Sequence, residues 1–309
     1  MSDALINKYR PKDFSEVVGQ DAVVRSLQAN LKRNSSRTFL FTGQSGVGKT
    51  TLARIVAQEA GCLPGDLLEV DAAVNTGIDD MRAVASTLLY RPLGEGAVKA
   101  IIIDESQALS KAACQSLLKI LEEPPPWAFW FLCTTEPARV PENIRTRCTR
   151  YDLKPVEIGV LIDLLEDVAT QEKLKLDPKI IDLCAKEAGG SPRQALSHLA
   201  TCAGVKDITE AKELLRSAIE SEEAVNLARA LVRGAGWNEV QRLLKGLDKV
   251  NPESVRHVVR SYLTKVALGA KTEASAGAAL ELLDCFSEPF NSGDGLSPLA
   301  LACGRAVLR

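Results

Sequence analysis

The sequence lacks several features that would point directly to a class of protein. No apolar run approaches the ~20 residues needed to span a bilayer, and residues 1–10 lack the apolar segment of a secretory signal, so we expect a cytoplasmic protein without membrane contact. None of the eight cysteines forms a C-x-x-C pair, so neither a disulfide framework nor a zinc site is indicated. A net charge of −2 argues against a protein that coats nucleic acid, and any DNA contact must come from local patches.

The length of 309 residues is typical of two or three domains, and the pattern of the sequence changes near residue 152. Before this point, short apolar runs alternate with helical stretches, which predicts a doubly wound α/β domain with a parallel sheet. After it, strand signals are nearly absent, and the final Ala/Leu/Val-rich third carries no chemical motif, which favours an oligomerisation or scaffold bundle. The expected strands are 39–42, 67–70, 98–103 and 127–135, and the expected later helices are 156–173, 178–188 and 191–203.

The segment 43–50, GQSGVGKT, fits the pattern G-x-x-x-x-G-K-[ST] of a phosphate-binding loop. It lies between a predicted strand and a predicted helix, which is the context that the motif requires. Gly43, Gly46 and Gly48 allow backbone N–H groups to turn toward a polyphosphate, and the helix N-terminus favours an anion. Lys49 would reach the β- and γ-phosphates, and Thr50 would place its hydroxyl on Mg²⁺. We interpret the loop as a nucleotide site.

Two acidic residues, Asp104 and Glu105, close the predicted strand at 98–103. Because ligands gather at the carboxyl ends of the strands in such sheets, we expect the acids to face the loop from the neighbouring strand. The first acid would bind Mg²⁺, and the second would polarise the water that attacks the γ-phosphate. Thr135, at the end of another strand, could orient this water, with Thr134 as the alternative.

The segment ahead of the first strand has two interpretations. Tyr9, Val17 and Val18 could wall off an adenine, because an apolar slot with backbone donors and acceptors suits a purine base. The same segment could equally be an N-terminal arm that is only tied down by Tyr9 and Phe14. The sequence leaves these interpretations even.

Several basic residues also have two interpretations. Lys111, Gln115 and Lys119 recur at i, i+4 and i+8 on a predicted helix, whose face could touch a phosphate backbone or be a plain solvated surface. Arg147, within a cluster of arginines, could make surface ion pairs or complete the site of a neighbouring subunit. Arg193, expected in the first turn of a helix, could report bound ATP as domain closure.

Together these segments resemble the clamp-loader ATPases of the AAA+ superfamily, which include the bacterial gamma/tau subunits and the small subunits of replication factor C. The resemblance covers about two-thirds of the chain, and its specificity comes from the order and spacing of the segments. The segments are KYRPKDFSEVVGQ (8–20), GQSGVGKT (43–50), EVDAAVNTGIDDMR (69–82), IIIDES (101–106), SLLKILEEPP (116–125), TTEP (134–137), IRTRC (144–148) and GGSPRQAL (189–196).

The resemblance implies a RecA-like ATPase core with a five-stranded parallel sheet (1–152), an all-α lid (153–207) and an all-α collar (208–309). The collar would join subunits into a five-membered open ring around DNA. In the family's terms, Lys49 and Thr50 form Walker A, Asp104 and Glu105 form Walker B, Thr135 is sensor 1, Arg193 is sensor 2 and Arg147 is an arginine finger acting in trans. The expected ATP-binding residues are Tyr9, Arg10, Val17, Val18, Gly43, Gly46, Val47, Gly48, Lys49, Thr50, Thr51 and Arg193. The expected Mg²⁺ ligands are Thr50 and Asp104, and the expected DNA contacts are Arg82, Lys111, Gln115 and Lys119.

Two departures from the family's pattern matter. The usual Ser-Arg-Cys stands here as Thr146-Arg147-Cys148, which keeps the arginine. Gamma/tau subunits carry a four-cysteine zinc module soon after the phosphate-loop helix, whereas this chain has only Cys62 there. We therefore expect no zinc.

The resemblance implies an ATP hydrolase that opens a sliding clamp and places it on primer–template DNA, with hydrolysis triggering release. Its expected partners are the clamp, this DNA, the other loader subunits and a DNA polymerase. One alternative is a branch-migration or helicase motor, which would need a basic DNA-binding module after the lid. Another is a structural subunit that does not hydrolyse ATP, although its phosphate loop and acids are intact.

Overall fold

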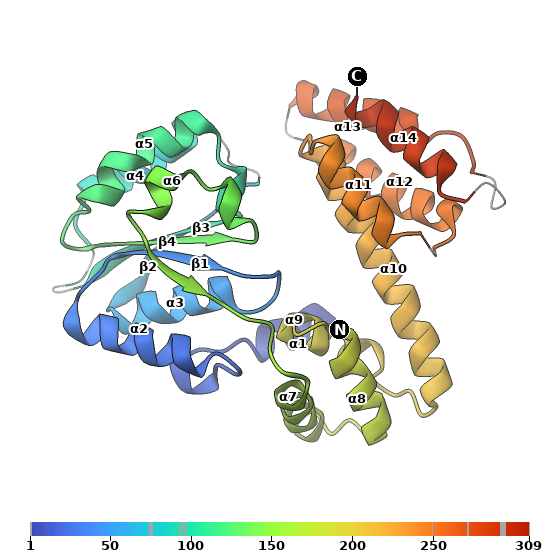
Figure 1. Ribbon diagram of the computed structural model, residues 1–309, viewed down its shortest axis with the longest axis horizontal. Helices are drawn as coiled ribbons and strands as arrows, with labels where there is room; N and C mark the ends of the chain where they lie inside the picture. The colour runs from blue at the N-terminus through green and yellow to red at the C-terminus, as the bar shows by residue number, and fades with distance from the viewer. Residues whose placement is uncertain are drawn as a thin grey trace. The chain divides into compact units, whose positions relative to one another are not determined.

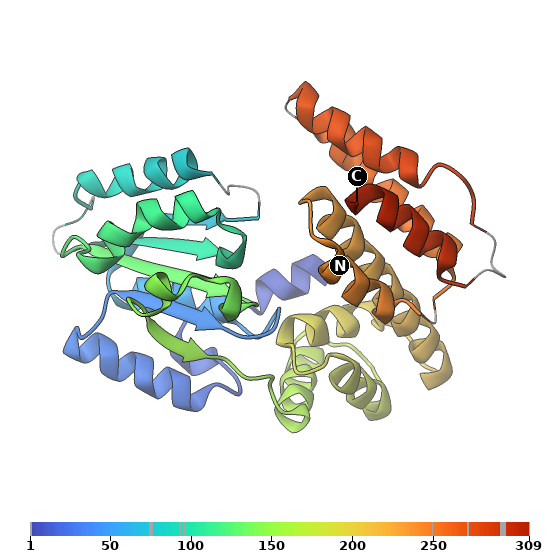
Figure 2. The same ribbon diagram turned by 45° about the horizontal axis from the view of Figure 1, so that its top comes forward.

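The computed structural model describes residues 2–73, 77–92, 94, 97–248, 250–270, 272–290 and 295–308. The chain divides into two compact units, Met1–Ile208 and Thr209–Arg309. Figures 1 and 2 show the strands confined to the first unit. No helix within the described ranges is long and apolar enough to cross a bilayer.

The first unit contains the predicted parallel sheet, and it has five strands in the order β2-β3-β4-β1-β5. All the pairings between neighbouring strands are parallel, so the predicted α/β class is confirmed. The strands are β1 (Thr38–Thr42), β2 (Cys62–Asp71), β3 (Val98–Asp104), β4 (Ala128–Thr134) and β5 (Thr149–Asp152).

Helices cover both faces of this sheet (Figure 1). One face packs on α2 (Asp21–Arg33) and α3 (Lys49–Glu59), and the other on α4 (Ile78–Ser86), α5 (Lys111–Glu122) and α6 (Glu142–Arg145). Because side chains alternate along a strand, Phe39 and Phe41 enter the first core whereas Leu40 enters the second. The Phe39 and Phe131 rings stack 5.2 Å apart, so β1 and β4 are joined by aromatic packing as well as hydrogen bonds.

Several elements of this unit, among them β5 and an N-terminal helix, were not expected from residue patterns. The strand β5 lies where we expected only an arginine-bearing segment, and α1 (Ser2–Lys8) lies within the presumed arm. A four-residue edge strand with one buried position has too little alternation to be recognised. The predicted opening of α4 at Asn75 and Thr76 lies outside the described residues.

The helices predicted for the lid are α7 (Ile158–Gln171), α8 (Pro178–Glu187) and α9 (Pro192–Thr201), close to their predicted bounds. The helix α1 packs against α9, and Lys8 and Tyr9 both donate to Oε1 of Glu172, at 2.5 and 2.6 Å. The N-terminal arm therefore contacts the lid as well as the sheet. A division of this unit at residue 152/153 remains a prediction.

The described residues of the second unit form helices joined by turns and loops. It consists of α10 (Ile208–Val232), α11 (Trp237–Gly246), α12 (Pro252–Gly269), α13 (Glu273–Cys285) and α14 (Ser297–Val307). Its core includes Leu227, Val259, Leu263, Phe286 and Leu299, each fully or almost fully buried. A contiguous core of this kind is consistent with a helical bundle.

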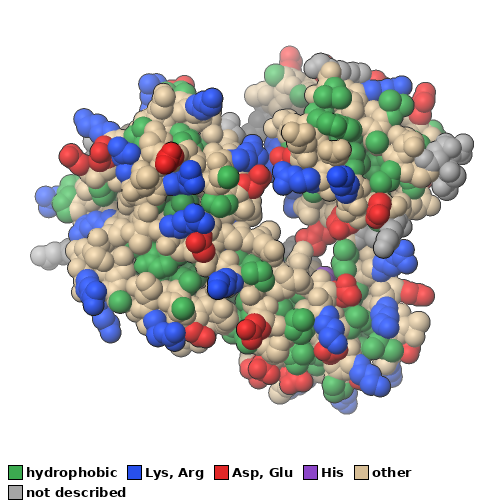
Figure 3. All heavy atoms as spheres, viewed as in Figure 1, with side chains coloured by type: hydrophobic (Ala, Val, Ile, Leu, Met, Phe, Trp, Pro, Cys, Tyr) green, Lys and Arg blue, Asp and Glu red, His purple; other side chains and the backbone are tan. Residues whose placement is uncertain are grey.

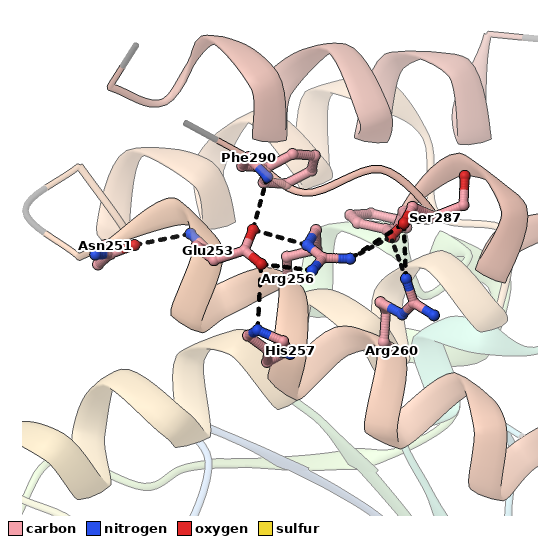
Figure 4. A network of polar contacts seen from close by, with 8 residues as sticks. Asn251, Glu253, Arg256, His257, Arg260, Ser287 and Phe290 are labelled. Atoms are coloured by element: carbon pink, nitrogen blue, oxygen red, sulfur yellow. Dashed lines mark hydrogen bonds and ion pairs between the residues drawn. The ribbon is translucent and has the colours of Figure 1, made fainter. Parts of the chain in front are cut away.

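A polar network ties α12 to the segment that follows α13 (Figure 4). The buried Arg256 and its neighbour Arg260 donate to the carbonyl oxygen of Phe286, at 3.0 and 3.2 Å. Glu253 accepts two bonds from Arg256 and one from the backbone N–H of Phe290 at 2.7 Å. The arginine hydrogen bonds are the main cause that lowers the pKa of Glu253 to about 2.

We expect acid to weaken the second unit through Glu253. Its pKa in the folded chain lies below its ordinary value of 4.5, so its stabilising contribution is present above pH 4.5 and is lost as the pH falls toward about 2. Glu253→Gln should lower the melting temperature at neutral pH and reduce its fall over this pH window. Calorimetry of the full chain measures both effects. Glu281→Gln, an exposed acid on α13, is the control, and equal pH profiles for the Glu253 variant and wild type would contradict the assignment.

Candidate active site

The loop between β1 and α3 has the shape expected of a phosphate-binding loop. Gly48 has φ 106° and forms the N-cap of α3, and Gly46 has φ 77°, a region that residues with a Cβ rarely occupy. These conformations, which glycine adopts without strain, let the chain turn directly into the helix. The unpaired N–H groups of the first helical turn then form a site that favours an anion.

Lys49 is folded against this loop. Its side chain is buried, with the residue 6% exposed, and Nζ donates to the carbonyl oxygens of Gly43 at 2.9 Å and Gln44 at 2.8 Å. Burial lowers the pKa of Lys49, and the nearby carboxylates of Glu105 and Asp104 oppose this shift. A bound polyphosphate would supply the negative charge that this partly desolvated ammonium group lacks.

Thr50 and Asp104 meet on the floor of the site. The Thr50 hydroxyl donates to Oδ2 of Asp104 at 2.7 Å, and the backbone N–H of Glu105 donates to Oδ1 at 3.0 Å. A hydroxyl beside a carboxylate is a suitable pair of hard oxygen ligands for Mg²⁺. The residues present therefore fit the predicted metal.

The expected strand position of the acids was wrong in one respect. Asp104 ends β3, which is not the neighbour of β1, because β4 lies between them. The side chains still meet, since Thr50 projects from the first turn of α3 rather than from β1 itself. The order of strands along the chain does not give their order in a doubly wound sheet.

Glu105 lies close to the end of β4. Its backbone has φ 50° and ψ 40°, which is unusual for a residue with a side chain. The Thr135 hydroxyl lies 3.5 Å from Oε2 of Glu105, and Gln107 donates to both side chains, at 3.1 Å in the case of Thr135. Thr134 is fully buried, and its hydroxyl donates to the amide oxygen of Gln107 rather than to Glu105. Thr135 therefore supplies the hydroxyl that lies beside the acid.

A pocket brings most of the predicted nucleotide-binding residues together. Those that line it are Tyr9, Arg10, Val17, Val18, Gly46, Val47, Gly48, Lys49, Thr50, Thr51, Asp104, Glu105 and Arg193. Gly43, Thr135 and Arg147 do not line it. Its further lining residues, which sequence reasoning missed, are Ile6, Pro11, Glu16, Ser45, Leu52, Leu164, Pro192 and Leu196. The apolar members from α1, α7 and α9 carry no local signal, because only packing brings those helices to the loop.

The segment ahead of β1 agrees in part with both interpretations from the sequence, a wall for adenine and an arm tied down by Tyr9 and Phe14. Tyr9 lines the pocket together with Val17 and Val18, while its hydroxyl is anchored on Glu172. Phe14 is buried in the core under the sheet, as a tied-down arm requires. The arm is therefore held in place and borders the pocket as well.

The lid approaches the phosphate loop at the start of α9. Ser191 caps this helix by accepting the N–H of Gln194 at 3.2 Å, and Arg193 lies in its first turn. A Cβ added at Gly46 would lie 2.1 Å from the Ser191 hydroxyl and 3.2 Å from Cβ of Arg193. The loop and the lid are therefore in close contact at Gly46.

We expect Gly46→Ala to destabilise the first unit and to weaken nucleotide binding. The positive φ costs about 1–2 kcal/mol for alanine, and the collision with Ser191 adds about 1–3 kcal/mol because moving that hydroxyl breaks the cap. Gly61→Ala is the matched control, since Gly61 has φ 94° but open space around its Cβ position. Chemical denaturation and titration with a fluorescent ATP analogue test both; equal losses in the two variants would refute the contact.

Arg147 lies away from this pocket, in a surface depression that it shares with Arg37 and Glu122. It pairs with Glu122 at 3.2 Å and donates to the carbonyl oxygen of Asn143 at 2.6 Å. Its Nε is buried and has no hydrogen-bond partner among the described residues. The position excludes a role in the pocket of its own chain and leaves both predicted roles, a surface ion pair and a neighbour's site, open.

The predicted DNA-binding residues are exposed on the helices above the sheet. Lys111, Gln115 and Lys119 all face solvent on α5, and Arg82 on α4 pairs with Asp79 at 3.2 Å. Figure 3 shows lysines and arginines interspersed with acidic side chains on the face in view. DNA contact through these four residues therefore stays a prediction.

All eight cysteines are free thiols, and Cys62 is half-buried at the start of β2. Within the described ranges, no group of three or more His, Cys, Asp or Glu side chains is arranged to hold a metal ion.

A family profile described as DNA polymerase III, delta subunit, matches residues 65–157. DNA polymerase III subunit tau of Escherichia coli (strain K12) is 32% identical over 307 residues, which covers 90% of this chain and 48% of that protein. The tau subunit of Bacillus subtilis (strain 168) is 34% identical over 218 residues, 63% of this chain and 38% of that protein. The chain spans about half the length, or less, of these curated relatives.

Solved structures of the RuvB Holliday junction branch migration motor of Thermotoga maritima resemble the chain in fold. One has a TM-score of 0.56 at 20% identity and covers 86% of this chain and 93% of that chain. A second gives 0.57 at 19% identity with the same coverage. At this identity the likeness concerns the fold alone, whereas the tau subunits match in sequence. These findings confirm the resemblance to the clamp-loader ATPases of the AAA+ superfamily: the chain is similar in sequence to bacterial DNA polymerase III tau subunits.

Proposed function

We propose that the chain is the ATPase subunit of a sliding-clamp loader, which opens the clamp and places it on primer–template DNA. ATP hydrolysis then triggers release of the closed clamp. The observation that carries the proposal is the pocket in which the phosphate loop, the Walker B acids and Arg193 of the lid converge. The similarity to DNA polymerase III tau subunits supports the replication role.

Each group at the pocket has a proposed task. Lys49 and the loop N–H groups bind the β- and γ-phosphates. Thr50 and Asp104 would hold Mg²⁺, which when bound neutralises charge on the phosphates. Glu105 accepts a proton from the attacking water, and Thr135 orients that water. The ribose and adenine would lie against the arm, at Tyr9, Arg10, Val17 and Val18, which suits an apolar base with polar edges.

Arg193 would couple the nucleotide to the lid. It enters the pocket from the first turn of α9, so its contact with phosphate would favour one position of the lid over others. The close approach of Gly46 to Ser191 supports this route, since the loop and the lid already touch there.

The complete site would form only in a ring. Arg147 is remote from the pocket of its own chain, so it would act as an arginine finger in the neighbouring subunit's pocket. Isolated subunits should then hydrolyse ATP slowly. The helical second unit is proposed as the collar that joins subunits, and the division into core (1–152), lid (153–207) and collar (208–309) is part of this proposal.

DNA would be gripped by phosphate contacts pooled over several subunits. With a net charge of −2, one chain offers little overall attraction for DNA. Lys111, Gln115 and Lys119 on α5, and Arg82 on α4, are the proposed contacts. Contacts to phosphates alone would make binding independent of base sequence.

The motor alternative has fold-level support from RuvB, but it needs a DNA-binding module beyond the lid. The second unit has no strand in its described residues, which disfavours a winged helix there. The structural-subunit alternative would be favoured by a broken site, yet Lys49, Thr50, Asp104 and Glu105 meet in the pocket.

The test is the ATPase rate of the assembled complex with clamp plus primed DNA, with each alone and with neither. Synergy between clamp and DNA supports loading. Stimulation by DNA without any effect of the clamp would support a motor, and no hydrolysis under any condition would support a structural subunit. A mass measurement of the purified complex would show whether its ring contains one chain type or several.

A further inference from the structure

Gln107 joins two of the proposed catalytic groups without lining the pocket itself. It lies in the 3-10 helix η3 (Ser106–Ala108), between the end of β3 and the start of α5, and is only 8% exposed. Its side-chain amide bonds the Glu105 carboxylate, the Thr135 hydroxyl at 3.1 Å and the Thr134 hydroxyl at 2.7 Å. One residue therefore links the end of β3 to the end of β4.

The direction of these hydrogen bonds follows from the chemistry of the groups. An ionised carboxylate can only accept, so the NH₂ of Gln107 must face Glu105, and it also reaches the Thr135 hydroxyl. The amide oxygen of Gln107 then faces Thr134, which must donate to it. The Thr134 oxygen in turn accepts the backbone N–H of Glu136 at 3.0 Å. In this orientation the NH₂ and the oxygen of the amide both have hydrogen-bond partners. If the amide were flipped, its oxygen would face the Glu105 carboxylate, and two acceptors would repel each other.

These hydrogen bonds fix the side chain of Glu105, a residue whose backbone conformation is unfavourable. Glu105 has a left-handed conformation, which costs about 1–2 kcal/mol for a residue with a Cβ and persists only where neighbours enforce it. Gln107 bonds Oε2 of Glu105, and the Thr135 hydroxyl lies 3.5 Å from the same oxygen. The amide of Gln107 bonds Oε2 of Glu105 and not Oε1.

We propose that Gln107 is a positioning residue that fixes the proposed base Glu105 and the proposed water-orienting Thr135 relative to each other. This inference rests on the proposed ATP hydrolysis. Thr134 has the supporting task of fixing the orientation of the amide. Because small misplacements of a catalytic group can cost about 10²-fold in rate, losing the amide should slow the chemical step.

The decisive variant is Gln107→Leu, which keeps the size of the side chain and removes its donor and acceptor. Measured in the assembled complex, its single-turnover hydrolysis rate should fall about 10- to 100-fold, while its affinity for ATP changes less than about two-fold. A loss confined to the chemical step distinguishes positioning from general damage to the pocket. Thr134→Val should slow the same step, and Thr134→Ser, which keeps the hydroxyl, should restore it.

Two further measurements keep the proposal separable from a folding defect. Because both residues act through one amide, the double variant of Gln107→Leu and Thr134→Val should be no slower than Gln107→Leu alone. Ser106→Ala is the matched control, since it removes a buried 3.0 Å hydrogen bond from the same turn to the carbonyl oxygen of Cys133. It should lower the melting temperature without slowing hydrolysis of bound ATP.

The outcomes separate the inference from the proposed function. If the wild-type complex hydrolyses ATP and Gln107→Leu hydrolyses it at the same rate, the positioning role is wrong. The ATPase proposal would then still stand. Equal slowing in Gln107→Leu and Ser106→Ala would also overturn it, since any weakening of the turn would then suffice. Wild-type protein that binds ATP but never hydrolyses it would overturn both.

Discussion

Replacing Arg147 by alanine should leave ATP binding unchanged and lower the DNA-stimulated turnover of the assembled complex about 10³-fold or more. An arginine supplied in trans is worth about 10³ to 10⁵ in rate, because it stabilises charge that develops in the transition state. Arg147 cannot act on the pocket of its own chain, since it lies in a separate depression beside Glu122. The expected loss therefore appears only where subunits meet.

The measurement compares isolated subunits with the assembled complex. The variant and the wild type should hydrolyse ATP equally slowly as single chains and differ strongly once assembled. Arg150→Ala is the matched control, because Arg150 is a nearby exposed arginine whose guanidinium pairs with Asp152 at 2.7 Å. Wild-type turnover of the Arg147 variant in the assembly would remove the arginine-finger assignment.

Glu105→Gln should bind ATP normally and hydrolyse it about 10² to 10⁴ times more slowly. The amide keeps the size of the side chain but cannot accept a proton from water, which is the contribution expected of a general base. Its neighbours Thr50 and Asp104 are untouched, so binding of the magnesium nucleotide should persist. The complex should then open the clamp and fail to release it.

Single-turnover hydrolysis and clamp release on primed DNA measure these two effects separately. Glu59→Gln, an exposed acid near the end of α3, controls for the change of charge. Hydrolysis at the wild-type rate in Glu105→Gln would place the base elsewhere. Release of the clamp without hydrolysis would instead break the proposed link between the two events.

Local sequence was sufficient for the features that short segments specify by themselves. The phosphate loop is contiguous, and its shape depends on glycine conformations and on the N-terminus of the next helix. Ser110 and Ser191 each cap a helix by accepting an N–H three residues later, an interaction that involves only neighbouring residues. The order of motifs was likewise enough to indicate the AAA+ fold.

The number of strands and the position of the acids were predicted only in part. The resemblance implied five strands, but the residues themselves indicated four, because β5 is short and mostly exposed on the sheet edge. The acids were placed correctly at the end of a strand and wrongly on the strand next to the loop. Gln107 stands two residues after Glu105, yet nothing in the segment DESQ shows that its amide also reaches β4.

The sequence by itself determined the phosphate loop, the helix caps and the alternation of strands with helices, because these depend on residues within about one turn of each other. Only the tertiary structure decided that β4 separates β1 from β3, that α1 packs on the lid, and that Gln107 joins two strand ends. It also placed Arg147 away from the pocket that Arg193 enters. These arrangements join residues far apart in the chain, and packing of the whole core selects among them.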